Sequence, residues 1–463
     1  MITAPRFLIA AAHKSSGKTV ISTGLAAALT ARGRAVSSFK KGPDYIDPMW
    51  LSAATRLPCY NLDFNTMAAS EIAPFFGSRV QSTDLSLIEA NKGLYDGVAM
   101  DGADSNAALA KHLGLPVILV IDTNGMTRGI APLLQGYLAF DPDVNIAGVI
   151  LNKVGGPRHE SKLRQAVATY TNLPVLGAVH RNSALEIGER HLGLTTPAES
   201  GQLDQMIKTF GEIVGASVDL DAIGRLAATA PDLPVVPQPA PCPTPDVRIA
   251  IAQDRAFGFY YADDLEAFGA AGATLVPFDT MKDTKLPQAD GLFIGGGFPE
   301  MFLEELSQNT PLQEDIKRAV EQGLPTYAEC GGLMYLCRTM AHQGKTRTMV
   351  GAIGADAVMH RRPQGRGYTR FENLPDHPWP ECPEVRAAHE FHYASLENLD
   401  PDLVFARAVK RGYGIDGKHD AVVTHNTLAG FCHLRAAGPM PWVPRFVDFV
   451  RKVKANKQKS PTI

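Results

Sequence analysis

The chain has 463 residues, of which 45% are hydrophobic and 20% are charged, and its formal net charge is −3 at pH 7. This length is too great for one ordinary hydrophobic core and predicts two domains. The composition is that of an ordinary globular protein, and the nearly balanced charge gives no reason to expect a nucleic acid partner. No apolar run approaches the roughly 18 residues of a membrane span, and the N-terminus lacks signal-peptide features, so we expect a cytoplasmic protein without a membrane partner.

The cysteines of the chain are sparse and form no Cys-x-x-Cys pair. They are Cys59, Cys242, Cys330, Cys337, Cys382 and Cys432. Such spacing predicts neither a disulfide framework nor a zinc ribbon.

Short apolar runs alternate with helical segments in the N-terminal half of the chain. The runs are residues 7–11, 85–89, 117–121 and 147–151. Strands that are apolar on both faces and separated by helices are typical of a parallel sheet covered on both sides. We therefore expect an α/β fold for this half.

The first apolar run leads into a candidate phosphate-binding loop at residues 11–20, which opens a helix. Backbone amides and a helix N-terminus in this setting can cradle phosphate. We expect Ser16 and Gly17 to contribute to that cradle, Lys18 to meet the β- and γ-phosphates of ATP, and Thr19 to bind Mg²⁺. The strict loop pattern asks for glycine at position 12, where this chain has alanine, so a chance Gly-Lys-Thr turn is the alternative interpretation.

A second polar segment, residues 39–48, places two lysines and two carboxylates around a glycine-proline turn. Lysines suit anionic oxygens and carboxylates suit Mg²⁺. We expect Lys40 and Asp44 to contact substrate or phosphate and Asp47 to bind the metal. The alternative is an ordinary charged turn.

Two further residues lie where ligand sites of open α/β sheets gather, at the carboxyl ends of strands. Glu89 ends a buried run, where a carboxylate is costly unless it is paired or binds metal, so we expect it to bind Mg²⁺. Asn152 follows another run, and its amide could read adenine, although a turn-forming Asn-Lys pair is an equal alternative.

Residues 231–245 are so rich in proline that neither a helix nor an inner strand can form there. A new series of apolar runs then begins at Val247 and predicts a second α/β domain. The C-terminal residues are basic, which favours a solvated helix end. We therefore expect a nucleotide domain at 1–230, a linker at 231–246, the second domain at 247–440 and a basic tail at 441–463.

Cys330 lies at a tight glycine turn after an apolar run, which is the setting of a nucleophile that precedes a helix N-terminus. About thirty residues earlier, Gly295, Gly296 and Gly297 follow another apolar run, and their amides could stabilise an oxyanion. A histidine must serve as the base. Spacing alone does not choose among the candidates, which are His389, His392, His419, His425 and His433.

Taken together, these motifs resemble the cobyrinic acid a,c-diamide synthase family over about residues 6–436. The resemblance is carried by the loop at 11–20, the Gly-Pro-Asp block at 42–48, Asn61-Leu62-Asp63 and the glutamate before Gly-Leu-Tyr-Asp-Gly at 93–97. It implies an N-terminal P-loop domain similar to dethiobiotin synthetase and a C-terminal domain similar to class I glutamine amidotransferases.

The resemblance also implies residue roles in the second domain. It selects His433 as the partner of Cys330. Many amidotransferases carry a carboxylate two residues after this histidine, whereas this chain has Arg435, so the third partner stays unassigned. Residues 390–393 match a family block and are placed near the site without a chemical role.

The activity implied is ATP- and glutamine-dependent amidation of the a and c acetates of a tetrapyrrole through an acyl phosphate, with ATP and Mg²⁺ as cofactors. Differences at Lys41, 49–51 and 90–92 resemble a branch thought to amidate sirohaem, so sirohaem and a corrin are both open as substrates, and a homodimer is one option for assembly. The alternatives are a partition-type P-loop switch ATPase without amidotransferase activity, a cobyric acid synthase acting on propionates, and a dethiobiotin-type ligase.

Overall fold

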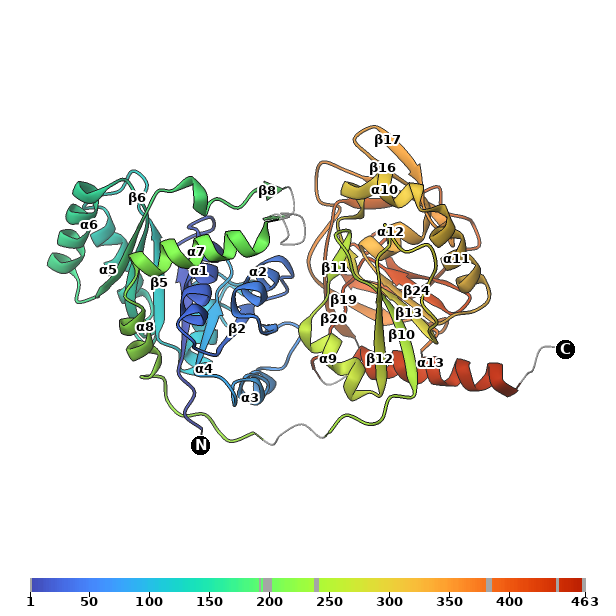
Figure 1. Ribbon diagram of the computed structural model, residues 1–463, viewed down its shortest axis with the longest axis horizontal. Helices are drawn as coiled ribbons and strands as arrows, with labels where there is room; N and C mark the ends of the chain where they lie inside the picture. The colour runs from blue at the N-terminus through green and yellow to red at the C-terminus, as the bar shows by residue number, and fades with distance from the viewer. Residues whose placement is uncertain are drawn as a thin grey trace. The chain divides into compact units, whose positions relative to one another are not determined.

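The computed structural model describes residues 2–190, 193–194, 202–236, 241–379, 385–438 and 441–459. The chain divides into two compact units, Met1–Pro239 and Ala240–Ile463 (Figure 1). Both units combine helices with a sheet, which is parallel in the first unit and mixed in the second, and this confirms the predicted α/β class. Within these ranges no helix is both long and apolar enough to span a membrane.

The first unit is built on a seven-stranded parallel sheet with the strand order β3-β2-β4-β1-β5-β6-β7. Its strands are β1 (Arg6–Ala11), β2 (Val36–Lys41), β3 (Cys59–Leu62), β4 (Leu85–Glu89), β5 (Val117–Asp122), β6 (Ile146–Val154) and β7 (Val175–His180). The four apolar runs identified in the sequence correspond to β1, β4, β5 and β6. All four are interior strands of the sheet, which explains why they are apolar throughout.

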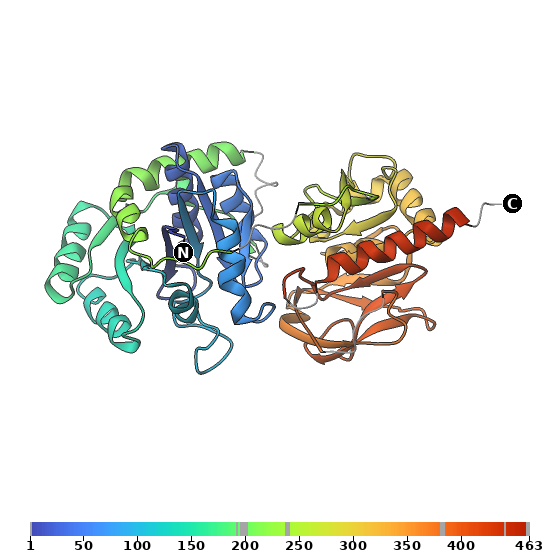
Figure 2. The same ribbon diagram turned by 90° about the horizontal axis from the view of Figure 1, so that it is seen from below.

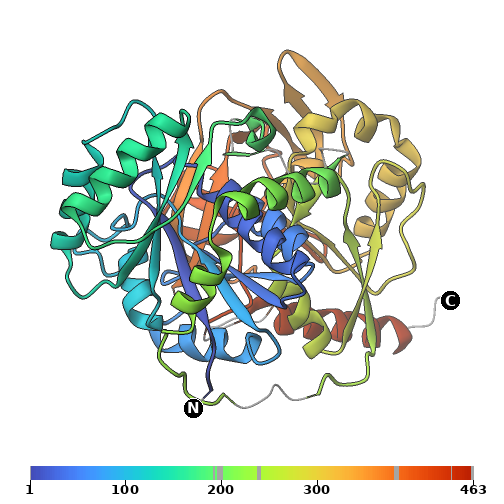
Figure 3. The ribbon, with the colours of Figure 1, turned by 60° about the vertical axis from the view of Figure 1, so that its left-hand side comes forward.

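Helices cover this sheet, and the short elements of the unit lie after β7. The helices are α1 (Lys18–Ala31), α2 (Ile46–Thr55), α3 (Ala69–Arg79), α4 (Asn106–Leu113), α5 (Ile130–Phe140), α6 (Pro157–Tyr170), α7 (Leu203–Ser217) and α8 (Leu220–Ala227), with a 3-10 turn at Ser183–Leu185 and the small strands β8 (Glu189–Arg190) and β9 (Gly193–Leu194). Helix α7 lies beside α1 (Figure 3). Gly24 allows this approach, because a Cβ there would lie 2.5 Å from a methyl carbon of Val214.

The second unit contains a nine-stranded sheet with the order β12-β10-β13-β15-β24-β23-β22-β19-β20. The strands are β10 (Val247–Ala252), β12 (Ala273–Phe278), β13 (Gly291–Ile294), β15 (Thr326–Glu329), β19 (Gly365–Asn373), β20 (Arg386–His392), β22 (Val404–Arg411), β23 (His419–Thr424) and β24 (Thr427–Gly430). The part from β12 to β24 is parallel and the part from β24 to β20 is antiparallel. A bridge between His389 and His433 joins the edge strand β20 to the segment that follows β24.

Smaller elements complete the second unit. The strands are β11 (Phe257–Phe259), β14 (Gly296–Gly297), β16 (Cys337–His342), β17 (Lys345–Thr348), β18 (Ile353–Met359) and β21 (Ala394–Glu397), and the helices are α9 (Ala262–Ala270), α10 (Leu303–Gln308), α11 (Thr310–Glu321), α12 (Gly331–Leu336) and α13 (Trp442–Lys459), with a 3-10 turn at Pro299–Phe302.

The segment expected to be a basic tail begins with helix α13, which lies along β10 and α9 (Figure 2). Trp442, Phe446 and Val450 are at most 1% exposed and join the core of the second unit. Their spacing is that of an apolar helix stripe. The start of this segment is therefore packed, and its lysines lie on the more exposed part of the same helix.

The first residues of the expected linker are attached to the first unit. Ile2 and Leu233 exchange two backbone hydrogen bonds of 2.8 and 2.9 Å. The buried guanidinium of Arg6 donates to the carbonyl of Pro231 at 2.7 Å. The attachment thus extends the first unit to residue 233, beyond the boundary expected at residue 230.

Replacing Trp442 with alanine tests whether α13 belongs to the core. The change removes a buried indole that also donates to Asp264 at 3.0 Å, and we expect it to reduce the free energy of unfolding by about 3–5 kcal/mol. Lys452→Ala, on an exposed position of the same helix, should change it by less than about 0.5 kcal/mol. Chemical denaturation monitored by circular dichroism measures both, and equal effects of the two changes would contradict this packing.

Candidate active sites

The loop between β1 and α1 has the strand-loop-helix form that the sequence predicts. Gly17 has a φ of 85° and precedes the helix directly. A Cβ at Gly17 would lie 2.3 Å from Nδ2 of Asn152, so both the backbone conformation and the close approach require glycine. Nδ2 of Asn152 donates to the carbonyl of Ser16 at 2.9 Å. Asn152 therefore holds the loop backbone, a role that the sequence did not indicate.

A buried cluster of charges lies at the carboxyl ends of β2 and β4. The ammonium of Lys40 donates to Asp47 and, at 2.9 Å, to Glu89, while the hydroxyl of Thr19 donates to Glu89 at 3.0 Å. Burial by itself lowers the pKa of Lys40, but the charges of Asp47 and Glu89 outweigh it and raise that pKa. The structure thus brings the expected metal residues and the expected phosphate-binding lysine together.

The pKa values of the two carboxylates in this cluster are shifted in opposite directions. Burial and the neighbouring Asp47 raise the pKa of Glu89 to about 7, although Lys40 opposes them. Burial also acts to raise the pKa of Asp47, but the charge of Lys40 outweighs it and lowers that pKa. Glu89 also has a buried oxygen, Oε2, without a hydrogen-bond partner in the part of the chain that the structure describes. A hydroxyl and two carboxylates, one with an unpartnered oxygen, fit the oxygen preference of Mg²⁺.

Asp44 and Lys18 make different kinds of contact in the first unit. Oδ1 of Asp44 accepts hydrogen bonds from the amides of Ile46 and Asp47 at 2.9 and 3.1 Å, so this carboxylate holds the start of α2. The ammonium of Lys18 donates to the carbonyl of Lys92 at 2.6 Å. Burial, followed by the charge of Lys40, lowers the pKa of Lys18 to about 8. An anion at the loop would raise this pKa again, which favours phosphate binding.

Cys330 occupies a sharp turn between β15 and α12. Its φ is 48° and its ψ is −101°, a conformation that is rare for a residue with a side chain. A Cβ at Gly332 would lie 2.2 Å from the carbonyl oxygen of Ile294, so the turn needs glycine there to pack against β13. The strained turn holds the thiol at the carboxyl end of the strand, as nucleophile turns do in other folds.

Among the candidate histidines, His433 is the one that reaches Cys330. Strand β24 pairs with β15 in parallel, so the segment after β24 ends beside the turn. Burial by itself lowers the pKa of His433, but hydrogen bonds to Cys330 and Glu329 outweigh it and raise that pKa to about 10. The geometry favours a charged imidazole beside Cys330.

The other candidate histidines have different partners. His389 stacks on His433 with ring centres 4.8 Å apart, and burial lowers its pKa, so it is a neutral neighbour. His392 stacks on Phe431. His419 pairs with Asp416 at 2.9 Å, away from the thiol. His425 lies at the turn between β23 and β24.

Two residues near His433 differ from what the sequence suggested. Arg435 donates from Nε to Asp263 at 3.1 Å, so its position two residues after the histidine does not supply a partner for the imidazole. Glu329 does, because its Oε2 lies 3.2 Å from Nδ1 of His433. The available signal was an acidic residue at the end of a buried strand, directly before Cys330.

Two of the glycines expected to form the oxyanion site lie close to His433 and to the turn that follows Cys330. A Cβ at Gly331 would lie 3.2 Å from the amide nitrogen of Gly297, and a Cβ at Gly296 would lie 2.9 Å from Cε1 of His433. The amide of Gly295 instead donates to the hydroxyl of Tyr260 at 3.0 Å. The amides beside the Cys330 turn are therefore those of Gly296 and Gly297, without Gly295.

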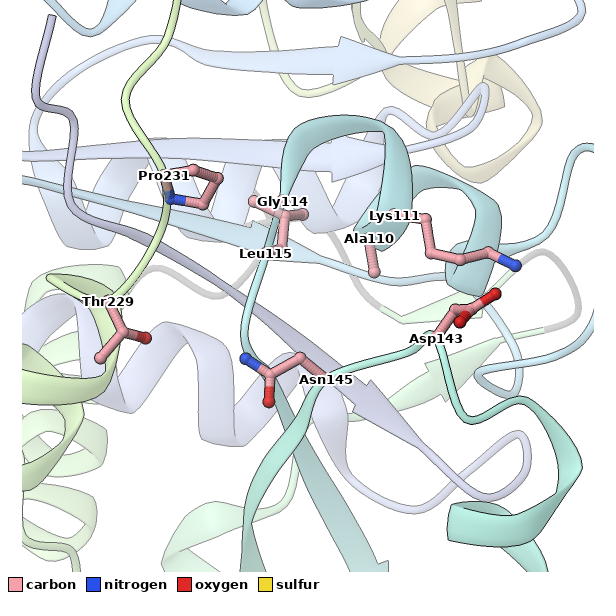
Figure 4. Close-up of a pocket in the computed structure, with 8 residues that line it drawn as sticks. All are labelled: Ala110, Lys111, Gly114, Leu115, Asp143, Asn145, Thr229 and Pro231. Atoms are coloured by element: carbon pink, nitrogen blue, oxygen red, sulfur yellow. The ribbon is translucent and has the colours of Figure 1, made fainter.

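A separate cavity of about 390 Å³ lies in the first unit (Figure 4). Its lining includes Leu115 and Asn145, which precede β5 and β6, and Thr229 and Pro231, which follow α8. It therefore opens at the amino ends of the strands, whereas the loop at 12–17 lies at their carboxyl ends. It is not the nucleotide site.

A loop with a buried lysine-carboxylate cluster in one unit and a cysteine-histidine pair in the other define a nucleotide-binding enzyme joined to an amidotransferase. Residues 7–194 match a family model described as the CobQ/CobB/MinD/ParA nucleotide binding domain, and residues 248–440 match one described as a CobB/CobQ-like glutamine amidotransferase domain. The chain is thus a glutamine-hydrolysing ligase by class.

Relatives that match nearly the whole chain show to which family within this class it belongs. A cobyrinate a,c-diamide synthase from Magnetococcus marinus is 43% identical over 97% of each chain, and one from Dehalococcoides mccartyi (strain CBDB1) is 38% identical over 93% of this chain and 95% of its own. A further one, from Methanosarcina barkeri, is 35% identical over 98% and 97%. The chain belongs to the cobyrinate a,c-diamide synthase family.

Replacing Gly297 with alanine tests the glycine strand beside Cys330. The new Cβ would lie 1.9 Å from the carbonyl oxygen of Ala256, so β14 must shift, and an oxyanion donor that is misplaced costs about 10²–10³ in rate. We expect a loss of that size in glutamine hydrolysis. Gly269→Ala, on α9 with its nearest contact at 3.9 Å, should leave the rate near that of the unmodified protein. Equal rates for both variants would contradict the assignment.

Proposed function

We propose that this chain amidates the a and c acetate side chains of cobyrinate, using ATP with Mg²⁺ and nitrogen from glutamine. The observation that carries the proposal is the Cys330–His433 pair on a chain whose other unit has a phosphate-binding loop. The names of relatives that match nearly the whole chain support the substrate. The proposal places the enzyme in the cytoplasm, where ATP and glutamine are supplied.

In the glutamine half, the thiolate of Cys330 attacks the side-chain carbonyl carbon of glutamine. The amides of Gly296 and Gly297 hold the oxygen that becomes negative. The C–N bond then breaks, and the nitrogen leaves as ammonia after it takes a proton from His433. A water molecule, deprotonated by the same imidazole, attacks the thioester, so that glutamate leaves and the thiolate is restored.

In the ATP half, the task of the protein is to activate a carboxylate that does not react with ammonia at neutral pH. An oxygen of the acetate takes the γ-phosphoryl group, ADP leaves, ammonia attacks the carbonyl carbon, and phosphate departs. Backbone amides at Ser16 and Gly17 and the ammonium groups of Lys18 and Lys40 would hold the phosphates. Asn152 would hold the loop in place. Because its side-chain amide lies against the loop, the same amide would also contact the bound nucleotide.

Thr19, Asp47 and Glu89 would hold the magnesium ion, which neutralises phosphate charge when it is bound. Lys40 pairs with both carboxylates and offsets part of their negative charge, and a bound cation would offset the rest. Asp44 supports the site indirectly, because it fixes the start of the helix that carries Asp47.

Cobyrinate is favoured over sirohaem because two of the residues that suggested sirohaem, Lys41 and Trp50, serve the fold. The buried ammonium of Lys41 donates to the carbonyl of Asp104 at 2.6 Å. Trp50 is 0% exposed and packs with Phe210 in a small core cluster. Residues that stabilise the first unit in this way give no reason to expect a different macrocycle.

A switch ATPase that only binds a partner is the less favoured alternative. It would leave the strained Cys330 turn and its charged histidine without use. Conformations of this kind cost of order 1–3 kcal/mol and are kept where function requires them.

Cys330→Ser tests the separation of the two reactions. The serine hydroxyl is a far weaker nucleophile than a thiolate, so we expect glutamine-dependent amidation to fall by about 10³-fold or more. Amidation supplied with ammonium chloride should continue near the normal rate. The exposed Cys242 provides the control, and Cys242→Ser should retain both activities. Loss of the ammonium-dependent reaction in Cys330→Ser would contradict the proposal.

Lys18→Ala tests the phosphate-binding loop. The change removes a buried positive charge that faces the phosphates, so amidation from either nitrogen source should fall by about 10²-fold or more. The hydrolysis of glutamine by Cys330 should still be detectable. Lys162→Ala, an exposed lysine of the same unit, should have no effect. Mass spectrometry of the tetrapyrrole product follows both variants, and amide formation by Lys18→Ala at the normal rate would exclude this loop from the reaction.

A further inference from the structure

Glu329, the last residue of β15, lies beside His433 in the interior of the second unit. Glu329 and His433 are each 3% exposed. The distance between Oε2 of Glu329 and Nδ1 of His433 is 3.2 Å. A carboxylate buried to this degree is costly unless charged or polar partners satisfy it.

The second oxygen of Glu329 is held as firmly as the first. Oε1 accepts a hydrogen bond of 2.8 Å from the amide of Leu434, the residue after His433, and another from the hydroxyl of Tyr327. One carboxylate therefore fixes both the imidazole ring and the main chain that carries it. The side chain has no freedom to rotate away without breaking three contacts.

The neighbouring carboxylates of α9 have partners of their own. Asp263 pairs with Arg435, and Asp264 accepts from the amide of Ala436 and the indole of Trp442. Both lie on α9, which packs against the same segment of chain.

Other titratable groups near His433 are His389, Cys330 and, through Glu329, Tyr327, and Arg435 lies close enough to act on His389. His389 stacks on His433 from β20 and is neutral, and the hydroxyl of Tyr261 on α9 meets Nδ1 of His389 at 3.3 Å. Cys330 forms a side-chain hydrogen bond with His433. Tyr327 contacts Glu329.

We propose that Glu329 is the positioning residue of the cysteine-histidine site, in the place that a carboxylate two residues after the histidine fills in many amidotransferases. It keeps the proton of His433 on Nδ1, which leaves Nε2 for the sulfur of Cys330, and it stabilises the imidazolium. This inference rests on the proposed glutamine hydrolysis and names the third member of that same site.

A measurable consequence is the upper pH limit of the reaction. Glutamine hydrolysis needs the imidazolium to protonate the departing nitrogen, so the rate falls as pH rises through the pKa of His433. Burial lowers that pKa, but the bonds to Cys330 and Glu329 bring it to about 10. Removing the charge of Glu329 removes one of the raising causes, so the alkaline limb must move to lower pH. Opposite charges at this distance shift a pKa by roughly 1–3 units.

The experiment compares Glu329→Gln, Tyr327→Phe and Asp263→Asn in the full-length protein. The measurements are kcat and KM for glutamine from about pH 6 to 11, a range that brackets imidazole pKa values of about 6.5 to 10, and amidation with ammonium chloride. Asp263→Asn is the matched control, since it also neutralises a buried carboxylate of this unit near the His433 segment. Tyr327→Phe loosens the clamp but leaves the charge.

For Glu329→Gln we expect kcat to fall by about 10²-fold or more with little change in KM, because a misplaced imidazole tautomer affects the chemical step. The alkaline limb of its glutamine hydrolysis should move down by about 1–2 pH units. Tyr327→Phe should reduce kcat by about tenfold or less without lowering the alkaline limb. Asp263→Asn should leave the alkaline limb in place.

Two outcomes would overturn the inference. The first is an alkaline limb of Glu329→Gln that stays with that of the unmodified protein. The second is an equal downward shift in Asp263→Asn. If Glu329→Gln does not fold, a Tyr327→Phe variant with a lowered alkaline limb or unchanged kcat also overturns it. Failure of the proposed function is distinguishable, because it would appear in the unmodified protein as absence of glutamine hydrolysis or of ammonium-dependent amidation.

Discussion

Parallel pairing of strands is the constraint on which both candidate sites depend, because it brings the carboxyl ends of neighbouring strands to one edge of each sheet. In the first unit, β1 lies between β4 and β5, and β2 pairs with β4. In the second unit, β15 lies between β13 and β24. Residues that are far apart in the chain thus meet at the loops after these strands.

The two sites use buried charge in different ways. In the first unit, one ammonium joins two carboxylates, and because Lys40 and Glu89 are deeply buried, the cluster is stable only while each of these charges has a partner. In the second unit, Glu329 and Cys330 lie on either side of one imidazole and favour its charged form. The first arrangement suits the binding of phosphates with a cation, and the second suits proton transfer during attack by sulfur.

The position of these charges also explains why the fold tolerates local strain. Cys330 adopts its unusual backbone conformation between a buried strand and a short helix whose six residues are all buried. Gly332 permits the contact with β13, and the pairing of β15 with β24 fixes the other side. The surrounding packing therefore fixes the conformation of the turn. The favourable contacts of that packing offset the free-energy cost of the strained backbone at Cys330.

The sequence predicted those features that local patterns encode. The inner strands β1, β4, β5 and β6 are continuous apolar runs, and the turns at Gly17 and Cys330 carry the glycines that their geometry needs. The edge strand β3 was not identified, because Cys59, Tyr60, Asn61 and Leu62 do not form an apolar run. The apolar stripe of α13 was present in the sequence, but the lysines near its end favoured a solvated tail.

Long-range partners could not be predicted from the same patterns. The contact of Glu329 with His433 spans 104 residues, and that of Arg435 with Asp263 spans 172. Each depends on which strands and helices become neighbours, and a single sequence does not encode that choice locally. Asn152 is a similar case, because its bond to Ser16 follows from the pairing of β5 with β6 and of β1 with β5.

The central claim of this account is that nitrogen released at Cys330 becomes the new amide nitrogen of the tetrapyrrole. The most direct measurement is mass spectrometry of the product formed from glutamine labelled with ¹⁵N in its side-chain amide, in the presence of MgATP, cobyrinate and a small amount of unlabelled ammonium. We predict that each new amide carries ¹⁵N. A product whose amides take their nitrogen from the unlabelled ammonium, while labelled glutamine is hydrolysed, would contradict the claim.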